Sequence, residues 1–240
     1  MGSYGGGLYR YDHHNKRYTH LKKGRGVGLS SDFITSVTPL ESGDMLIGTA
    51  FGGIDRIEAD QLENANPKIS AFLPGLLPSH EKFNNRRKSV FQDKKGIIWI
   101  TTVLDGLYKY DPHNQSLKHY AHNPDDTTSI SDNHVSSICE GDNGLLWIAT
   151  DKGLDVLDAK KEVFTRYFTD HGLPDNTVIG VMTDNRGFVW ALTRKWISRL
   201  NPHNGEIRNF NFYHRVVMGL FTDKRICRTH DGDFFVGTRI

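Results

Sequence analysis

The sequence has few cysteines and no long apolar run. Cys139 and Cys227 are its only cysteines, and they lie far apart in 240 residues. Their separation fits neither a CxxC redox or zinc motif nor a disulfide framework, so we interpret both as small core residues. No stretch approaches the roughly 18 apolar residues of a membrane span, and the first residues lack the apolar segment of a signal peptide.

A dominant charge and the familiar catalytic motifs are also missing. Thirty Lys and Arg face 28 Asp and Glu, which gives a formal net charge of +2. No field of one sign is therefore expected to hold nucleic acid or an anionic membrane surface. The chain contains no GxSxG elbow, no Walker loop, no GxGxxG after a strand and no HExxH. The usual nucleophile, phosphate and zinc devices are thus excluded as linear motifs.

The residues that are plentiful indicate short strands and tight turns. The chain has 24 Gly but 8 Pro, together with many β-branched and aromatic residues. This mixture is typical of all-β proteins. No segment keeps an apolar period of 3.6 for about ten residues, so a repeat that contains helices is not expected.

A strand-like string recurs along the whole chain. It reads DMLIGT, IIWITT, LLWIAT, FVWALT and DFFVGT, and it ends at Thr49, Thr102, Thr150, Thr193 and Thr238. A polar turn and an earlier apolar strand precede each copy, which predicts a hairpin. A third strand follows each Thr, as in DGLYKYD and KGLDVLD, and a fourth strand follows another polar turn.

Four strands in each period indicate antiparallel β-propeller blades. We therefore predict an all-β fold, a single β-propeller domain over residues 1–240 built from four-stranded antiparallel blades. The five repeats run approximately over residues 4–49, 50–102, 103–150, 151–193 and 194–238.

The ends of the chain leave two arrangements open. Residues 1–3 match the last three residues of the DMLIGT strand, so the sequence opens within a blade. The five repeats could close a five-bladed ring by pairing strands from both termini, or they could belong to a larger, typically seven-bladed, propeller. The second arrangement is favoured because a reading frame seldom opens at the end of a strand, although an exposed blade edge is a hazard.

The repeat resembles the two-component regulator propeller repeat. The resemblance rests on a polar loop, an inner strand, a DxxG turn, the WI(G/A)TxxGL string and YDP. It is clearest in SISDNHVSSICEGDNGLLWIATDKGLDVLD, from Ser129 to Asp158. The sequence departs from the pattern at Leu46 and Phe235, which replace the Trp, and at Trp196, which replaces the glycine of TxxG.

The resemblance implies a function that composition does not. Such propellers lie in the periplasmic part of sensor histidine kinases, notably in hybrid two-component systems of Bacteroidota that detect glycan fragments. It thus implies sensing, a periplasmic location and a carbohydrate or other small polar ligand. Further blades or sensor domains of the same polypeptide are the implied partners. No kinase, receiver or DNA-binding segment occurs in these residues, so this chain is not expected to be an enzyme.

Several conspicuous residues have structural explanations. Trp99, Trp147 and Trp190 recur at one blade position and are expected to pack between sheets. The Thr at each strand end is expected to make a blade hydrogen bond rather than to be a catalytic hydroxyl. Four His lie in DHHN, DPHN and NPHN turns, where Asp or Asn bonds the backbone; they are His13, His14, His113 and His203. We expect no cofactor and no metal site, because no His cluster has zinc-like spacing.

Candidate ligand residues lie in the loops that should emerge on one propeller face. These are the loops that lead into each inner strand and the TxxG loops. Trp196 breaks the glycine pattern there, and such departures often mark function. An exposed indole beside Arg and Asn would suit a sugar ring. The candidates are Asp32, Phe51, Asn85, Arg86, Arg87, Asp105, Asn133, His134, Asp151, Asn176, Arg194, Lys195 and Trp196.

Two other functional classes stay open. Propeller enzymes can assemble catalytic groups from separate blades, so a lyase or hydrolase of the streptogramin lyase type is the main alternative. Its acid or base candidates would be His134 and His171, with Arg86 or Arg87. From their places in the sequence, either histidine could reach the pore of a propeller. The third hypothesis is a protein-interaction scaffold, the common use of WD-repeat propellers.

Overall fold

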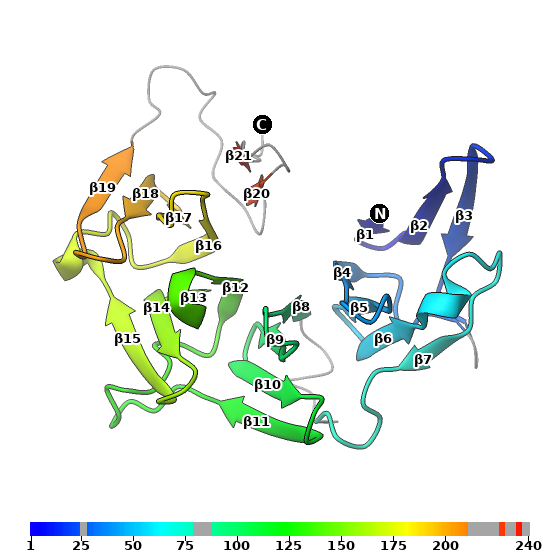
Figure 1. Ribbon diagram of the computed structural model, residues 1–240, viewed down its shortest axis with the longest axis horizontal. Coiled ribbons are helices and arrows are strands. Elements are labelled where there is room, and N and C mark those ends of the chain that lie inside the picture. Colours follow the sequence, from blue (N-terminus) through cyan, green and yellow to red (C-terminus); the bar gives the residue numbers. More distant parts are fainter. Residues whose placement is uncertain (25–27, 79–87, 211–225, 229–233, 237–240) are drawn as a thin grey trace. The chain divides into compact units, whose positions relative to one another are not determined.

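The computed structural model describes residues 1–24, 28–78, 88–210, 226–228 and 234–236. Within these ranges the protein is all-β apart from three single turns of 3-10 helix. Every sheet is a meander in which consecutive strands pair antiparallel. The predicted all-β propeller fold is confirmed. Figure 1 shows the successive sheets, which we number as blades 1 to 6 in chain order.

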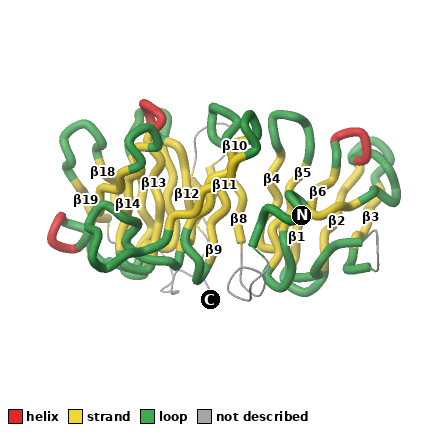
Figure 2. The backbone as a smooth tube through the Cα atoms, turned by 90° about the horizontal axis from the view of Figure 1, so that it is seen from below, coloured by secondary structure: helices red, strands yellow, loops and turns green. Residues whose placement is uncertain are grey.

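The chain divides into two compact units, Met1–His119 and Tyr120–Ile240. Unit 1 holds blades 1 to 3, apart from the last residue of blade 3, and unit 2 holds blades 4 to 6. In each unit the loops and turns lie at the two ends of the strands (Figure 2). One end carries the loops into the inner strands and the TxxG loops, and we call it the loop end. The other carries the two hairpin turns of each blade, and we call it the turn end.

Unit 1 contains eleven strands. Blade 1 comprises β1 (Gly2–Ser3), β2 (Gly7–Asp12) and β3 (Arg17–Leu21). Blade 2 comprises β4 (Ile34–Pro39), β5 (Met45–Thr49), β6 (Ile54–Ile57) and β7 (Ile69–Ala71), with the 3-10 turn η1 (Ala59–Gln61) after β6. Blade 3 comprises β8 (Lys88–Gln92), β9 (Ile98–Thr102), β10 (Leu107–Asp111) and β11 (Ser116–Tyr120).

Unit 2 continues the same order. Blade 4 comprises β12 (Val135–Glu140), β13 (Leu145–Thr150), β14 (Gly153–Asp158) and β15 (Val163–Tyr167), with η2 (Asp142–Gly144) before β13. After η3 (Thr169–His171), blade 5 comprises β16 (Val178–Thr183), β17 (Val189–Thr193), β18 (Ile197–Leu200) and β19 (Ile207–Phe210). The described part of blade 6 is β20 (Ile226–Arg228) and β21 (Phe234–Val236).

Neighbouring blades bury apolar side chains against one another. Blades 2 and 3 share a cluster that includes Leu46, Ile54 and Ile100, and blades 4 and 5 share one that includes Trp147 and Val181. Burying a large aliphatic or aromatic side chain contributes about 1.5–3 kcal/mol, so these seams hold each unit together. Hydroxyl groups also link inner strands, as where Thr38 Oγ1 donates to the Val90 carbonyl at 2.8 Å.

The core interpretation of the tryptophans is confirmed at two positions. Trp99 is 0% exposed and Trp147 is 2% exposed, whereas Trp190 is half-buried. The DxxG turn explains part of this pattern. Asp93 accepts the Trp99 indole N–H at 2.9 Å, and Asp184 accepts that of Trp190 at 2.8 Å. The same two aspartates also accept backbone amides of their turns, so one side chain both closes the turn and orients the indole.

The histidine turns also behave as the sequence predicts. Asp12, Asp111 and Asn201 each accept the backbone amide two residues further on, which belongs to a histidine in every case. These contacts fix the turn between the third and fourth strands without using the imidazole rings. Within the described ranges, no three His, Cys, Asp or Glu side chains come together in a way that could hold a metal ion.

Candidate functional site

The TxxG loops are held by a buried threonine. Thr49, Thr102, Thr150 and Thr193 are each 0% exposed. Their Oγ1 atoms donate to the carbonyls of Gly53, Gly106, Gly153 and Trp196 at 2.8–2.9 Å. The predicted blade hydrogen bond is therefore confirmed for four repeats. These hydroxyls position the loop end and are not available as nucleophiles.

Trp196 fits its loop without backbone strain. Its carbonyl accepts both the amide and the hydroxyl of Thr193, as the Gly106 carbonyl accepts both groups of Thr102. The other loops need glycine for two different reasons. Gly106 has the left-handed backbone conformation, with φ +73°. At Gly153 the reason is steric, because a Cβ would come within 2.9 Å of the Phe168 ring. Trp196 is not among the residues with positive φ.

The polar residues that lead into the inner strands act as caps. Asp32, Asn133 and Asn176 each accept a backbone amide from the segment that arrives from the preceding strand. The donors are Lys23, His122 and Thr169, at 2.7, 2.7 and 2.8 Å. These side chains fasten the loops to one another. Asn85, Arg86 and Arg87 lie outside the described residues.

Asp105 is turned into its blade. The side chain is buried and accepts the Tyr108 hydroxyl at 2.5 Å, while the Asp105 backbone amide donates to Thr102 Oγ1. Burial, reinforced by this carboxylate, raises the pKa of Tyr108 above its usual range. Asp105 thus supports the loop from within rather than facing a ligand at its surface.

A charged cluster lies at the loop end of unit 2. His134 Nδ1 is 2.6 Å from Asp151 Oδ2, and Lys152 Nζ is 3.2 Å from Asp132 Oδ2. We call Asp132, His134, Asp151 and Lys152 the histidine–aspartate cluster. The hydrogen bond from His134 lowers the pKa of Asp151, and the charge of Arg194 acts in the same direction. The His134 and Asp151 side chains are 27% and 33% exposed, so solvent and solutes reach them.

The other predicted residues of unit 2 are more scattered. Arg194 and Lys195 are exposed, and Trp196 is half-buried beside them in the sequence. His171 lies in η3, where its Nδ1 accepts the Phe168 amide at 3.1 Å. This places it beside the end of the outer strand β15, whereas His134 directly precedes the inner strand β12. Outer-strand residues do not line a pore, so the expectation that His171 reaches one is wrong.

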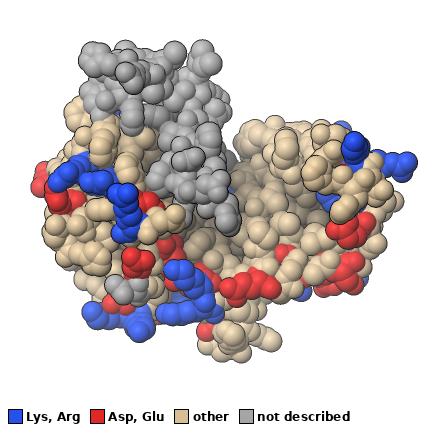
Figure 3. Space-filling model, turned by 45° about the horizontal axis from the view of Figure 1, so that its top comes forward, with Lys and Arg blue, Asp and Glu red and all other residues tan. Residues whose placement is uncertain are grey.

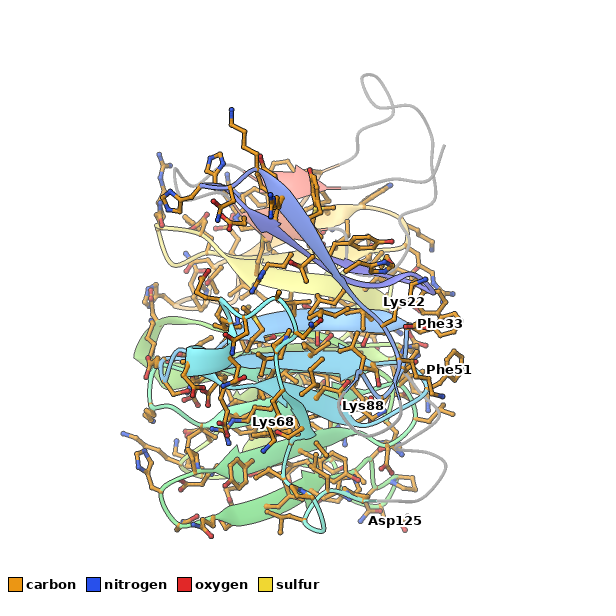
Figure 4. All side chains as sticks on the ribbon, turned by 90° about the vertical axis from the view of Figure 1, so that its right-hand side faces the viewer. Lys22, Phe33, Phe51, Lys68, Lys88 and Asp125 are labelled. Carbon is orange, nitrogen blue, oxygen red and sulfur yellow. The ribbon has the colours of Figure 1, made fainter. Side chains whose placement is uncertain are left out.

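Unit 1 carries an aromatic triad that sequence reasoning recognised only in part. The rings of Tyr4 and Phe33 lie 5.0 Å apart, and those of Phe33 and Phe51 lie 5.1 Å apart, both edge to face. Tyr4 is 62% exposed and Phe51 is 51% exposed. Figure 4 shows Phe33 and Phe51 at the same edge of unit 1. Only Phe51 was predicted; Tyr4 and Phe33 pair with each other in an isolated β-bridge next to short strands.

A buried lysine supports the Phe51 loop. Lys88 is 0% exposed, and its Nζ donates to the Gly52 carbonyl at 2.7 Å. It pairs with Thr102, at the position where Ile34, Val135 and Val178 face the corresponding threonines. Burial lowers the pKa of Lys88 to about 8. The three aliphatic positions precede a β-bulge that β8 lacks. Because of this register difference, aligning the repeats by sequence does not reveal that Lys88 occupies the equivalent position.

The two loop-end clusters differ in the chemistry they offer. The aromatic triad presents ring faces and edges, which suit a ligand with an apolar face. The histidine–aspartate cluster presents a carboxylate-oriented imidazole between charged groups. Acidic and basic side chains are interspersed on the face drawn in Figure 3, in keeping with the small net charge.

Comparison with known proteins supports the repeat assignment. Residues 129–152 match the family model described as two component regulator propeller. No curated protein matches the sequence. In the part of the chain that the structure describes, no helix is long and apolar enough to cross a membrane.

Solved structures show the same fold. The extracellular domain of the hybrid two component system BT3049 from B. thetaiotaomicron matches with a TM-score of 0.69 and 22% identity over 90% of this chain and 29% of that one. The corresponding domain of BT4673 from the same organism matches with a TM-score of 0.68 and 20% identity, over 98% of this chain and 38% of that one.

A propeller enzyme is also similar. Virginiamycin B lyase from Staphylococcus aureus matches with a TM-score of 0.63 and 17% identity over 85% of this chain and 62% of that one. The chain thus spans well under half of the two extracellular domains from B. thetaiotaomicron. It is a β-propeller chain that carries a two component regulator propeller repeat and shares its fold with the extracellular domains of hybrid two component systems.

Proposed function

We propose that this chain is a ligand-sensing propeller of a periplasmic two-component sensor, and that the loop end of unit 1 binds a carbohydrate fragment. The observation that carries the proposal is the exposed aromatic triad. Large apolar rings are normally buried, and an exposed group of them at the end of a rigid blade is typical of a binding surface. No bond of the ligand needs to be broken for such a role.

The triad suits a sugar because its geometry is fixed before binding. Phe33 contacts both neighbours edge to face, which leaves ring area for the apolar C–H face of a pyranose. The Phe51 loop is held by Thr49 and by Lys88 through the backbone of Gly53 and Gly52. Pre-organisation of this kind lowers the ordering cost of binding.

The sensor part of the proposal draws support from the repeat at residues 129–152 and from the fold of the two B. thetaiotaomicron domains. Those domains are described as extracellular, which agrees with a periplasmic location. Because the chain spans 29% and 38% of them, we propose further blades or sensor domains of the same polypeptide as its partners. Ligand binding would then bias how these parts pack.

Phe51→Ala tests the carbohydrate site. The purified chain is titrated with a library of glycan fragments, and thermal shift and calorimetry identify a binder. We expect Phe51→Ala to weaken that binder at least tenfold, which corresponds to about 1.4 kcal/mol. Tyr18→Ala is the matched control, because Tyr18 is 72% exposed but lies on the outer strand β3. Equal affinities for wild type and Phe51→Ala would reject the triad as the site.

The histidine–aspartate cluster favours a second candidate function, a propeller lyase or hydrolase. Asp151 fixes the His134 ring through Nδ1, which leaves Nε2 to act as a base or an acid. The expected result for an enzyme is a new product from a fragment of the library, lost in His134→Ala and reduced in Asp151→Asn. Stabilisation by a fragment without any product, at high protein concentration and long incubation, supports sensing and counts against this candidate.

A further inference from the structure

A groove of about 280 Å³ lies on blade 4 in unit 2. Its floor is one face of the sheet, where Trp147, Val156 and Thr165 stand side by side in three paired strands. The neighbouring turn of blade 5 contributes Pro202 to its wall. Lys161 and Pro202 belong to hairpin turns at the turn end, so the groove is separate from the loop-end clusters.

The groove contains the Trp147 indole, whose N–H lacks the aspartate acceptor found in blades 3 and 5. In blades 3 and 5 the DxxG aspartate accepts the indole N–H of the following Trp. Blade 4 has Gly141 at that position, six residues before Trp147. Within the described part of the chain, the Trp147 N–H makes no hydrogen bond, although the side chain is 2% exposed. The ring is almost fully buried, but the N–H is not among the enclosed polar atoms that lack a partner, which in the described residues are Thr101 Oγ1 and Asp155 Oδ1. The donor can therefore still be reached, and this position is a candidate for binding.

Other hydrogen-bond donors of the groove are also uncommitted. Neither the Tyr167 hydroxyl nor the Thr165 hydroxyl is bonded to a described residue. Burial raises the pKa of Tyr167, so its hydroxyl keeps its proton at neutral pH. Lys161 adds a cation at the rim, 3.4 Å from Asp158. The oxygens of Asp158 are already engaged by Lys161 and by turn amides, so the groove offers donors and few acceptors.

We infer that this groove is a second ligand site, which takes a small organic compound with carbonyl or carboxylate oxygens on an apolar ring. The ring fills the space between Trp147, Val156 and Pro202. The oxygens accept from the Trp147 indole and from Tyr167 or Lys161. The volume lies just below the range of about 300–1,000 Å³ for small-molecule pockets, which limits the ligand to a single ring with a short substituent. The site is independent of the proposed carbohydrate site.

Indole N–H resonances provide a direct test. The chain has four Trp, so a ¹H–¹⁵N spectrum of the full protein has four indole signals. The signal that disappears in Trp147→Phe is assigned to the Trp147 indole. The probes are phenylacetate and phenylacetamide, with benzylamine as a ring of similar size that lacks an acceptor. We expect a saturable shift of the Trp147 signal with phenylacetate, phenylacetamide or both, and at least a tenfold weaker response to benzylamine.

Variants separate the site from a general surface effect. Gly141→Asp restores the carboxylate found in the other blades and should reduce the response at least tenfold. A Cβ at Gly141 would come within 2.7 Å of the indole nitrogen, so Tyr167→Phe and Lys161→Gln serve as variants with less strain. They should weaken binding several-fold, Lys161→Gln mainly for phenylacetate. No shift with either acceptor probe, equal shifts of all four indoles, or an equal response to benzylamine would overturn the inference.

Discussion

The loop after β5 in unit 1 and the loop after β13 in unit 2 rest on the same polar network. In unit 1 Ser30 bonds Asp55 and approaches Thr49, and in unit 2 Ser131 bonds Asp155 and Thr150. The charges buried nearby differ. Both units bury the aspartate of this network, Asp55 at 4% and Asp155 at 0% exposed, but unit 1 also buries the cation of Lys88 under an aromatic loop tip, whereas the tip in unit 2 is charged. The repeat thus fixes the support of a loop and leaves its tip and its buried charge free to vary.

The largest expected effect is a pH dependence caused by Asp155. Burial raises the pKa of Asp155 to about 7, and its Oδ1 accepts no hydrogen bond from a described residue. The folded state therefore holds this proton more tightly than the unfolded state, so stability falls as pH rises from about 4 to about 7. The loss should be up to about 4 kcal/mol.

Asp155→Asn should flatten this slope. The measurement is the free energy of unfolding from urea titrations at pH 5 and pH 8 for wild type and variant. Comparing the two proteins cancels the contribution of the histidines, which both contain. Asp55→Asn is the comparison from unit 1, where burial also raises the pKa but the aspartate accepts both groups of Ser30. Parallel pH curves for wild type and Asp155→Asn would contradict the prediction.

Lys88 should produce the opposite slope at higher pH. Its pKa of about 8 lies below the ordinary value of 10.5, so the unfolded state binds this proton more tightly. Stability should rise by up to about 3 kcal/mol between pH 8 and pH 10.5, and Lys88→Met should remove that rise. The same variant loses the bond to Gly52, so it should also weaken a ligand held by Phe51. An unchanged alkaline profile in Lys88→Met would show that the lysine is not buried in solution.

Thr150 and Thr49 should differ in how much the free energy of unfolding falls when the hydroxyl group is removed. Thr150 Oγ1 lies 2.7 Å from Ser131 Oγ, whereas Thr49 Oγ1 lies 3.4 Å from Ser30 Oγ. Both also donate to a glycine carbonyl at 2.9 Å. We expect Thr150→Val to cost about 2–3 kcal/mol and Thr49→Val about 1–2 kcal/mol, measured by denaturant unfolding. Equal costs would mean that the serine contact contributes nothing.

The smallest effects are expected at the loop tips. Phe51 is exposed, and Lys152, whose side chain is 63% exposed, forms an ion pair with Asp132. Phe51→Ala and Lys152→Ala should each change the free energy of unfolding by less than about 0.5 kcal/mol. Any loss of ligand binding in these variants would then report on recognition. A larger destabilisation would show that the tips are part of the scaffold.

Much of the fold could be predicted because propeller repeats are local. The strand containing Trp99 and Thr102, the turn closed by Asp93 and the hairpin between them all follow from residues close in sequence. The candidate site was harder to predict, because the residue types that cap loops, such as Asn and Asp, are also the types that bind ligands. Asn133 and Asn176 were chosen for their place in a loop, yet each holds a backbone amide.

The sequence by itself determined the strands, the turns and the threonine that ends each second strand, since alternation and turn chemistry act over a few residues. Only the tertiary structure decided which side chains meet at the loop end and which charged side chains are buried. Tyr4, Phe33 and Phe51 meet because loops from two blades converge, and Lys88 is buried because β8 lacks a bulge. Such contacts depend on how blades pack, which no single repeat encodes.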